Sequence, residues 1–90
     1  MTDSTPRLTA EELGEYISIP EAVKLHKHLN AELLNRWVKH GVLTRHEPAV
    51  RIFFHFRPMG GRNCTTRRDV LDFLAALKHD APEELVEKFS

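Results

Sequence analysis

The sequence predicts a mainly α-helical fold with a small β-hairpin. Apolar side chains recur at helical spacing in several segments, and a capping residue precedes most of them. One run, Val50–Arg57, is instead β-branched and aromatic and alternates with a period of two. The turn-forming residues Pro-Met-Gly-Gly at 58–61 follow that run, so a hairpin is expected directly after it.

The 90 residues have room for one domain. Residues 1–7 are polar and contain a proline, and are predicted to be a flexible tail. Residues 8–90 are predicted to form a single domain that ends in a short helix. The chain is 41% hydrophobic and 29% charged, which is typical of a globular protein and excludes collagen-like or wholly disordered classes.

The longest apolar runs are a few residues, far short of the roughly 20 that span a bilayer. The first residues lack the apolar core of a signal peptide, so a cytoplasmic protein is expected. The single cysteine, Cys64, excludes an internal disulfide framework.

Two capping boxes predict short helices near the N-terminus. Thr9 and Glu12 have the required spacing for the first, which Gly14 should end. Residues 16–17 are compatible with a very short strand. Ser18 begins the second helix, which is expected to run to about Lys27.

The next helix is predicted over residues 30–40. Asn30 is a good N-cap and Gly41 a natural C-terminal stop. Its inward stripe comprises Leu33, Leu34, Trp37 and Val38, and its outer face comprises Ala31, Glu32, Asn35, Arg36, Lys39 and His40. Together with the helix before it, this arrangement is typical of a helix-turn-helix, although generic helical hairpins look similar.

The C-terminal third is predicted to be helical. In the hairpin, Val50, Ile52, Phe54 and Phe56 share one face, and residues 62–65 form the return strand. A cap at Thr66 and Asp69 begins a helix to about His79, and residues 80–83 lead into a short last helix with Leu85, Val86 and Phe89 inward.

Positive charge is concentrated in the middle of the chain. Eight Lys or Arg against two acids give residues 35–69 a net charge of +6, whereas residues 1–34 (three against six) and 70–90 (two against five) each carry −3. Seven of the eight cations are arginine, which suits bidentate contacts with phosphate and guanine. Such a block is the footprint of a nucleic-acid-binding surface, or else a solvated face with salt bridges to the acidic flanks.

Four segments in order resemble the excisionase and MerR-type winged helix-turn-helix family: YISIPEA (16–22), NRWVKHG (35–41), GGR (60–62) and TTRRDVLDFL (65–74). The resemblance implies a mainly α fold with a small β-hairpin wing. It also implies a small DNA-binding protein that assists site-specific recombination, or the DNA-reading part of a transcriptional regulator. Its partners would be double-stranded DNA, with a recombinase or integrase, or neighbouring copies of the chain.

The resemblance assigns roles to individual residues. Trp37 matches a core aromatic residue of the recognition helix, 30–40, which would lie in the major groove. The wing at 57–63 would follow the flanking groove or backbone, and the start of the third helix would bind phosphate. The expected DNA-binding residues are Asn35, Arg36, Lys39, His40, Arg57, Arg62, Asn63, Arg67 and Arg68.

Other features favour a second hypothesis, a protein-interaction module on the same fold that binds or inhibits another protein without DNA. Glu32 would meet DNA phosphates unfavourably, the net charge of the whole chain is zero, and Phe53, on the less apolar face of the predicted strand with His55, is expected to be exposed. Separately, the segment from Val42 to Met59 is long for a wing of this family.

An enzyme is not expected. The six histidines and Cys64 invite a zinc hypothesis, but His26 and His28 at a spacing of two point apart on a helix and no cysteine pair supports them. Cys64 is expected to fill core space rather than act as a nucleophile. No phosphate-binding glycine loop is present, so neither a cofactor nor a small-molecule substrate is predicted.

Overall fold

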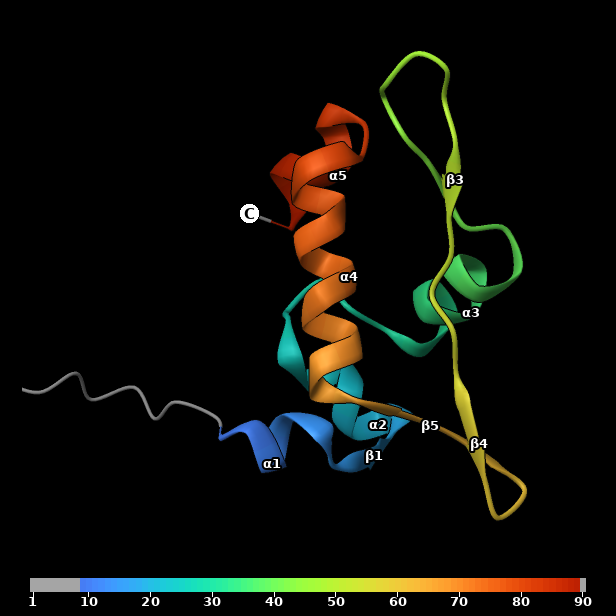
Figure 1. Ribbon diagram of the computed structural model, residues 1–90, viewed down its shortest axis with the longest axis vertical. Coiled ribbons are helices and arrows are strands. Elements are labelled where there is room, and N and C mark those ends of the chain that lie inside the picture. The colour runs from blue at the N-terminus through green and yellow to red at the C-terminus, as the bar shows by residue number, and fades with distance from the viewer. Residues whose placement is uncertain (1–8, 90) are drawn as a thin grey trace, which may run out of the picture.

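The computed structural model describes residues 9–89, so the tail expected at 1–7 lies outside the described residues. About half of the residues are helical, and two small antiparallel sheets complete the fold (Figure 1). The elements are α1 (Ala10–Gly14), β1 (Tyr16–Ser18), α2 (Ile19–Ala22), the 3-10 helix η1 (Val23–Leu25), α3 (Ala31–Lys39), β2 (Val42–Leu43), β3 (Arg51–Ile52), β4 (Arg57–Met59), β5 (Arg62–Thr66), α4 (Arg67–Asp80) and α5 (Glu83–Lys88).

The larger sheet has the strand order β1-β5-β4. β1 pairs with β5, with Ile17 opposite Thr65, and the β4–β5 hairpin puts Met59 opposite Arg62. Gly60 and Gly61 close this hairpin with φ of 58° and 81°, values that L side chains rarely adopt. The expected hairpin is therefore present. Its turn consists of Gly60 and Gly61 alone, whereas Pro58 and Met59, which were expected in the turn, belong to β4.

The run Val50–Arg57 is not one strand, contrary to the sequence-based prediction. Its start, β3, pairs with β2, and its end leads into β4, which pairs with β5; residues 53–56 belong to no strand. The reason is that the run has two different partners with the end of α3 between them, where the Phe54 N–H donates to the Trp37 carbonyl at 3.2 Å. The predicted alternation is confirmed from Ile52 to Arg57, since Phe54 is buried, Ile52 and Phe56 are half-buried, and Phe53 and His55 are exposed. Val50, predicted on the same apolar face, is 56% exposed, because it precedes the segment that packs on the core.

The second helix is shorter than expected. The helical residues end at Leu25 rather than Lys27, because His26 is extended and a turn closed by a hydrogen bond from the Leu29 N–H to the His26 carbonyl follows. The side chain of Leu29, at the end of this turn, is buried in the hydrophobic core. The capping box is also incomplete, because Glu21 accepts from the Ser18 hydroxyl and not from its backbone.

The predicted starts of α3 and α4 are confirmed. The Asn30 side chain accepts from the Leu33 N–H at 2.8 Å, and the Thr66 hydroxyl accepts from the Asp69 N–H at 3.1 Å. Gly41 follows α3 with φ of 67°. These local signals place α3 and α4 within about a residue of the expected bounds.

The core lies between α3, α4 and the segment that follows β3. Trp37 packs on Phe73 and Phe89 with ring centroids 5.0 and 5.5 Å apart, and Phe54 packs on Phe73 at 5.6 Å. Helical spacing turns Val70, Phe73 and Leu77 of α4 into this cluster. Across residues 9–89, no helix combines the length and the apolar character that crossing a membrane requires.

Candidate nucleic-acid interface

The outer face of α3 is polar because its apolar side chains are used in the core. Leu34 and Trp37 are buried, which turns Asn35, Arg36, Lys39 and His40 to the outside, where all four are exposed. The side chains of Arg36 and Lys39 make no hydrogen bond or ion pair with any residue from 9 to 89. Glu32, also exposed, adds one carboxylate to this face.

The β4–β5 hairpin carries a second polar group. Arg62 and Asn63 are exposed next to the glycine turn, and within the described residues Arg62 has no side-chain partner. In Figure 1 the hairpin and α3 both lie to the right of α4. The fold therefore brings the two elements that carry these predicted cations to one side of this helix.

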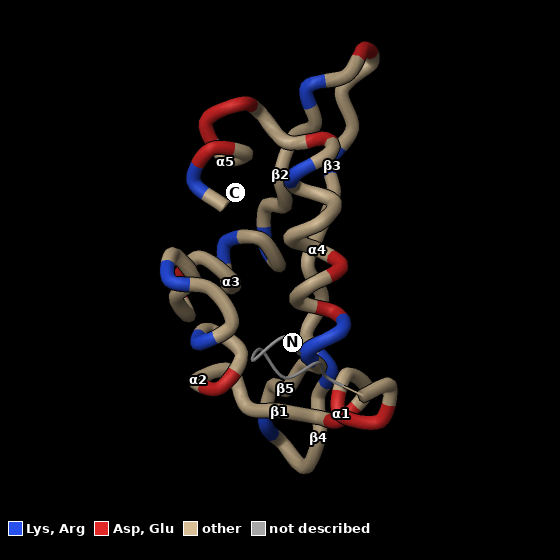
Figure 2. Tube along the Cα trace, turned by 90° about the vertical axis from the view of Figure 1, so that its left-hand side faces the viewer, with Lys and Arg blue, Asp and Glu red and all other residues tan. Residues whose placement is uncertain are grey.

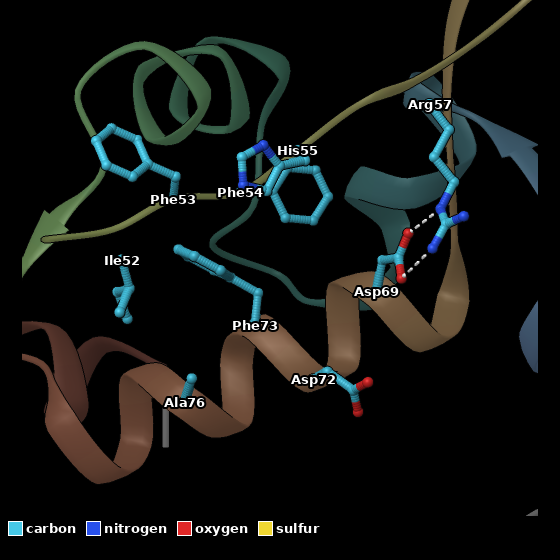
Figure 3. A pocket seen from close by; sticks show the side chains of 9 residues that line it. All are labelled: Ile52, Phe53, Phe54, His55, Arg57, Asp69, Asp72, Phe73 and Ala76. Carbon is cyan, nitrogen blue, oxygen red and sulfur yellow. Dashed lines mark hydrogen bonds and ion pairs between the residues drawn. The ribbon is translucent and has the colours of Figure 1, made fainter.

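Arg57 is held by a partner within the chain. Its Nε donates to Asp69 Oδ2 at 2.6 Å and its Nη2 to Oδ1 at 3.2 Å, linking β4 to the first turn of α4 (Figure 3). These hydrogen bonds and the carboxylate charge, with a smaller contribution from Tyr16, raise the pKa of Arg57 above its ordinary value. The carboxylate of Asp69, which could have paired with Arg67 or Arg68, is thus used by Arg57.

Arg67 and Arg68 do not extend the polar face of α3. Arg67 is half-buried and donates to the Glu12 carbonyl at 3.4 Å, which attaches α1 to α4. Arg68 is exposed, but it lies two residues before the buried Val70, on the opposite side of α4. Because α3 packs on the buried face of α4 through Trp37 and Phe73, Arg68 on the exposed face points away from α3 (Figure 2).

Half of the cations between residues 35 and 69 have partners within the chain. Besides Arg57 and Arg67, Arg45 donates to the His79 carbonyl and Arg51 to the His40 carbonyl, each at 2.9 Å. Both carbonyls belong to helix C-termini, which cationic side chains stabilise. These two roles leave no local pattern in the sequence, because the partners lie 34 and 11 residues away.

Trp37 is 3% exposed and contacts the rings of the core, as expected of a structural aromatic residue. Among residues 9–89, no three His, Cys, Asp or Glu side chains gather in a geometry that could hold a metal ion. Cys64 is half-buried on β5. The rings of His26 and His28 lie beside the buried ring of Phe89, the first tilted and the second edge-on, with centroids 5.0 and 6.3 Å from it.

Comparison of the chain with protein-family models, with curated proteins and with solved structures finds no match.

Proposed function

We propose that the chain is a winged helix-turn-helix protein that binds double-stranded DNA. In this reading α2 and η1 form the first helix of the motif, α3 is the recognition helix and the β4–β5 hairpin is the wing. The observation that carries the proposal is that Arg36 and Lys39 of α3 and Arg62 of the β4–β5 hairpin are exposed cations without partners among residues 9–89. The two elements that carry them both lie to the right of α4 in Figure 1.

The mechanism follows from the shape of these two elements. The polar face of α3 fits the major groove, where Asn35 and Arg36 reach base edges and Lys39 and His40 reach phosphates. Arg62 and Asn63 at the wing tip contact the flanking backbone. Arg57 serves this surface indirectly, because its pairing with Asp69 sets the direction of the wing.

The small interface suits a protein that binds DNA together with further copies of itself or with another DNA-binding protein. Single modules of this size bury little DNA surface, so neighbouring copies or a recombinase would supply the remaining affinity. Bending the site costs on the order of 1–6 kcal/mol, which the additional contacts offset. Excision of a mobile element and transcriptional regulation are both compatible with this mode of binding.

A salt-dependent titration tests the proposal. Anisotropy of a labelled random-sequence duplex is measured at about 50 and 200 mM salt, where non-specific binding in the range of roughly 1–100 μM should weaken steeply. Combining Arg36→Ala with Lys39→Ala should lower the salt slope by about two and Arg62→Ala by about one. Lys78→Ala, which removes an exposed cation of α4, is the matched control and should bind as the wild type does.

The competing function is a protein-interaction module that does not bind DNA. Half of the cations between residues 35 and 69 have internal partners, and Glu32 lies on the same face as Arg36 and Lys39. This function requires that no duplex binds at the lower salt. The same titration therefore separates the two.

A further inference from the structure

An open groove runs along the segment after β3 and α4, beside the contact between Phe54 and Phe73 (Figure 3). Its volume is about 440 Å³, within the range of natural ligand sites. On one side it is lined by successive residues of an extended segment, and on the other by one face of a helix at spacings of three and four. The lining residues are Ile52, Phe53, Phe54, His55 and Arg57, with Asp69, Asp72, Phe73 and Ala76 of α4.

The extended segment has a free backbone edge. Residues two apart in an extended chain direct their N–H and C=O groups to the same side. The Val50 carbonyl accepts from the Thr44 N–H, and the Phe54 N–H donates to Trp37, so the even-numbered residues face β2 and α3. Phe53 and His55 face the other way. Within the described part of the chain their backbone groups have no hydrogen-bond partner.

The free charge at the groove is negative. Asp69 is neutralised by Arg57, whereas Asp72 is exposed and makes no ion pair with any residue between 9 and 89. The apolar surface beside it is substantial, since Phe53 is 41% exposed and Phe73 forms the floor with Ala76. A complementary ligand needs apolar side chains and a cation.

We propose that this groove binds an extended segment of a partner protein, which adds as a β-strand along Phe53–His55. Its backbone pairs with the free N–H and C=O groups of Phe53 and His55, as in other cases of strand addition. One apolar side chain lies over Phe73 and Ala76, and a neighbouring Lys or Arg pairs with Asp72.

The site is independent of the proposed DNA surface. The groove opens between the segment and α4, whereas the polar face of α3 points away from the core and so away from α4. Residues 51–55 extend about 17 Å at the usual rise per residue, enough to pair with a short strand. A DNA-bound molecule could therefore hold a protein segment at the same time.

Selection from a phage-displayed library of random dodecapeptides tests the proposal with the full chain as bait. The enriched peptides should alternate apolar residues with others and carry Lys or Arg. Asp72→Lys should weaken the binding of a selected peptide about tenfold or more. A copy of the peptide with Glu in place of its Lys or Arg should bind the Asp72→Lys variant more tightly than it binds the wild-type protein. Glu15→Lys, an equal charge reversal on the exposed end of α1, is the matched control and should change neither affinity.

Backbone pairing is tested separately from charge. Two copies of the selected peptide are N-methylated, one at its odd-numbered residues and the other at its even-numbered residues. Their affinities for the protein should differ, because only one of the two copies loses the N–H donors that face Phe53 and His55. In ¹⁵N-resolved spectra the amides of Phe53 and His55 should shift and become protected from exchange.

Three outcomes overturn the proposal. They are no enrichment above the unselected library, equal binding of both N-methylated copies, or peptide-induced shifts that fall on Arg36 and Lys39 instead of the groove. The DNA titration is unaffected by any of them, so a failure of DNA binding and a failure of the groove are distinguishable.

Discussion

Arg57 donates hydrogen bonds to both carboxylate oxygens of Asp69, with its Nε 2.6 Å from Oδ2 and its Nη2 3.2 Å from Oδ1. The pair connects edge strand β4 to the first turn of α4, where no backbone hydrogen bond joins these two elements within the described residues. Arg57 was expected to face DNA, but it instead attaches the β4–β5 hairpin, which carries Arg62, to α4.

Replacing Arg57 should affect stability more than the electrostatics of DNA binding. The two side chains are 52% and 25% exposed, so water screens the pair and Arg57→Gln should lower the free energy of unfolding only slightly. A double-mutant cycle with Asp69→Asn in urea measures the coupling. The salt slope for DNA should stay closer to wild type than that of Arg62→Ala, and an equal loss of slope in both variants would make Arg57 a phosphate contact.

Gly41 should be the least replaceable glycine. Its φ is 67°, and a Cβ would lie 2.6 Å from the Ile52 carbonyl and 3.0 Å from the Phe53 ring. Gly41→Ala should therefore lower the free energy of unfolding by about 1–3 kcal/mol or more, because strain and a backbone clash add. It should also disturb the groove through Phe53.

Two other glycines serve as controls for this measurement. Gly60 has a positive φ but an open surrounding, so Gly60→Ala should cost only the strain, about 1 kcal/mol. Gly14 lies in α1 with no atom near its Cβ position, and Gly14→Ala should stabilise by roughly 0.5–1 kcal/mol. If all three variants unfold at the same urea concentration, the clash at Gly41 is not significant.

Stability should fall on mild acidification because of His28. Desolvation beside Phe89, with Lys27, His26 and Lys88 nearby, lowers the pKa of His28 from its ordinary 6.5. The unfolded chain then binds this proton more readily than the folded one, so the stabilising contribution is complete above pH 6.5 and is lost as the pH falls towards the lower folded value.

Urea midpoints at several pH values between about 5 and 8 measure this effect. His28→Gln should flatten the decrease towards acid, because the group that takes up the proton is gone. His55→Gln removes an exposed imidazole that makes no ring contact with that cluster, and it should leave the decrease unchanged. A His28→Gln profile that overlays the wild type would remove His28 from the explanation.

Glu32 should oppose DNA binding while it supports α3. It lies in the first turn of α3, where a carboxylate interacts favourably with the helix dipole by about 0.3–1 kcal/mol, and on the face of Arg36 and Lys39. Glu32→Gln should therefore raise affinity for random-sequence duplex a few-fold and slightly lower the unfolding midpoint. Affinity unchanged or reduced, measured by anisotropy, would place this face away from the phosphates.

Much of the local structure was predictable from short-range patterns. Asn30, Thr66 and Gly41 mark helix ends through hydrogen bonds or dihedral angles within three or four residues, so the bounds of α3 and α4 followed from the sequence. The polar face of α3 was predictable for the same reason, since helical periodicity separates it from the buried stripe of Leu34 and Trp37.

The assignment of the arginines was not predictable, because it depends on partners far along the chain. Arg45, Arg57 and Arg67 have partners 34, 12 and 55 residues away, and nothing near these residues in sequence distinguishes them from Arg36 or Arg62. The net charge of +6 over residues 35–69 therefore suggests more unpaired cations than the fold leaves, because four of the eight have partners within the chain.

By itself the sequence determined which segments are helical, where α3 and α4 begin and end, and which faces are apolar, since capping and periodicity act within a turn or two. Only the tertiary structure decided that Val50–Arg57 is divided between two sheets, that Arg57 pairs with Asp69, and that a free backbone edge lies beside α4. Those outcomes depend on which distant groups the packed core brings within hydrogen-bond distance, and a local pattern does not contain that information.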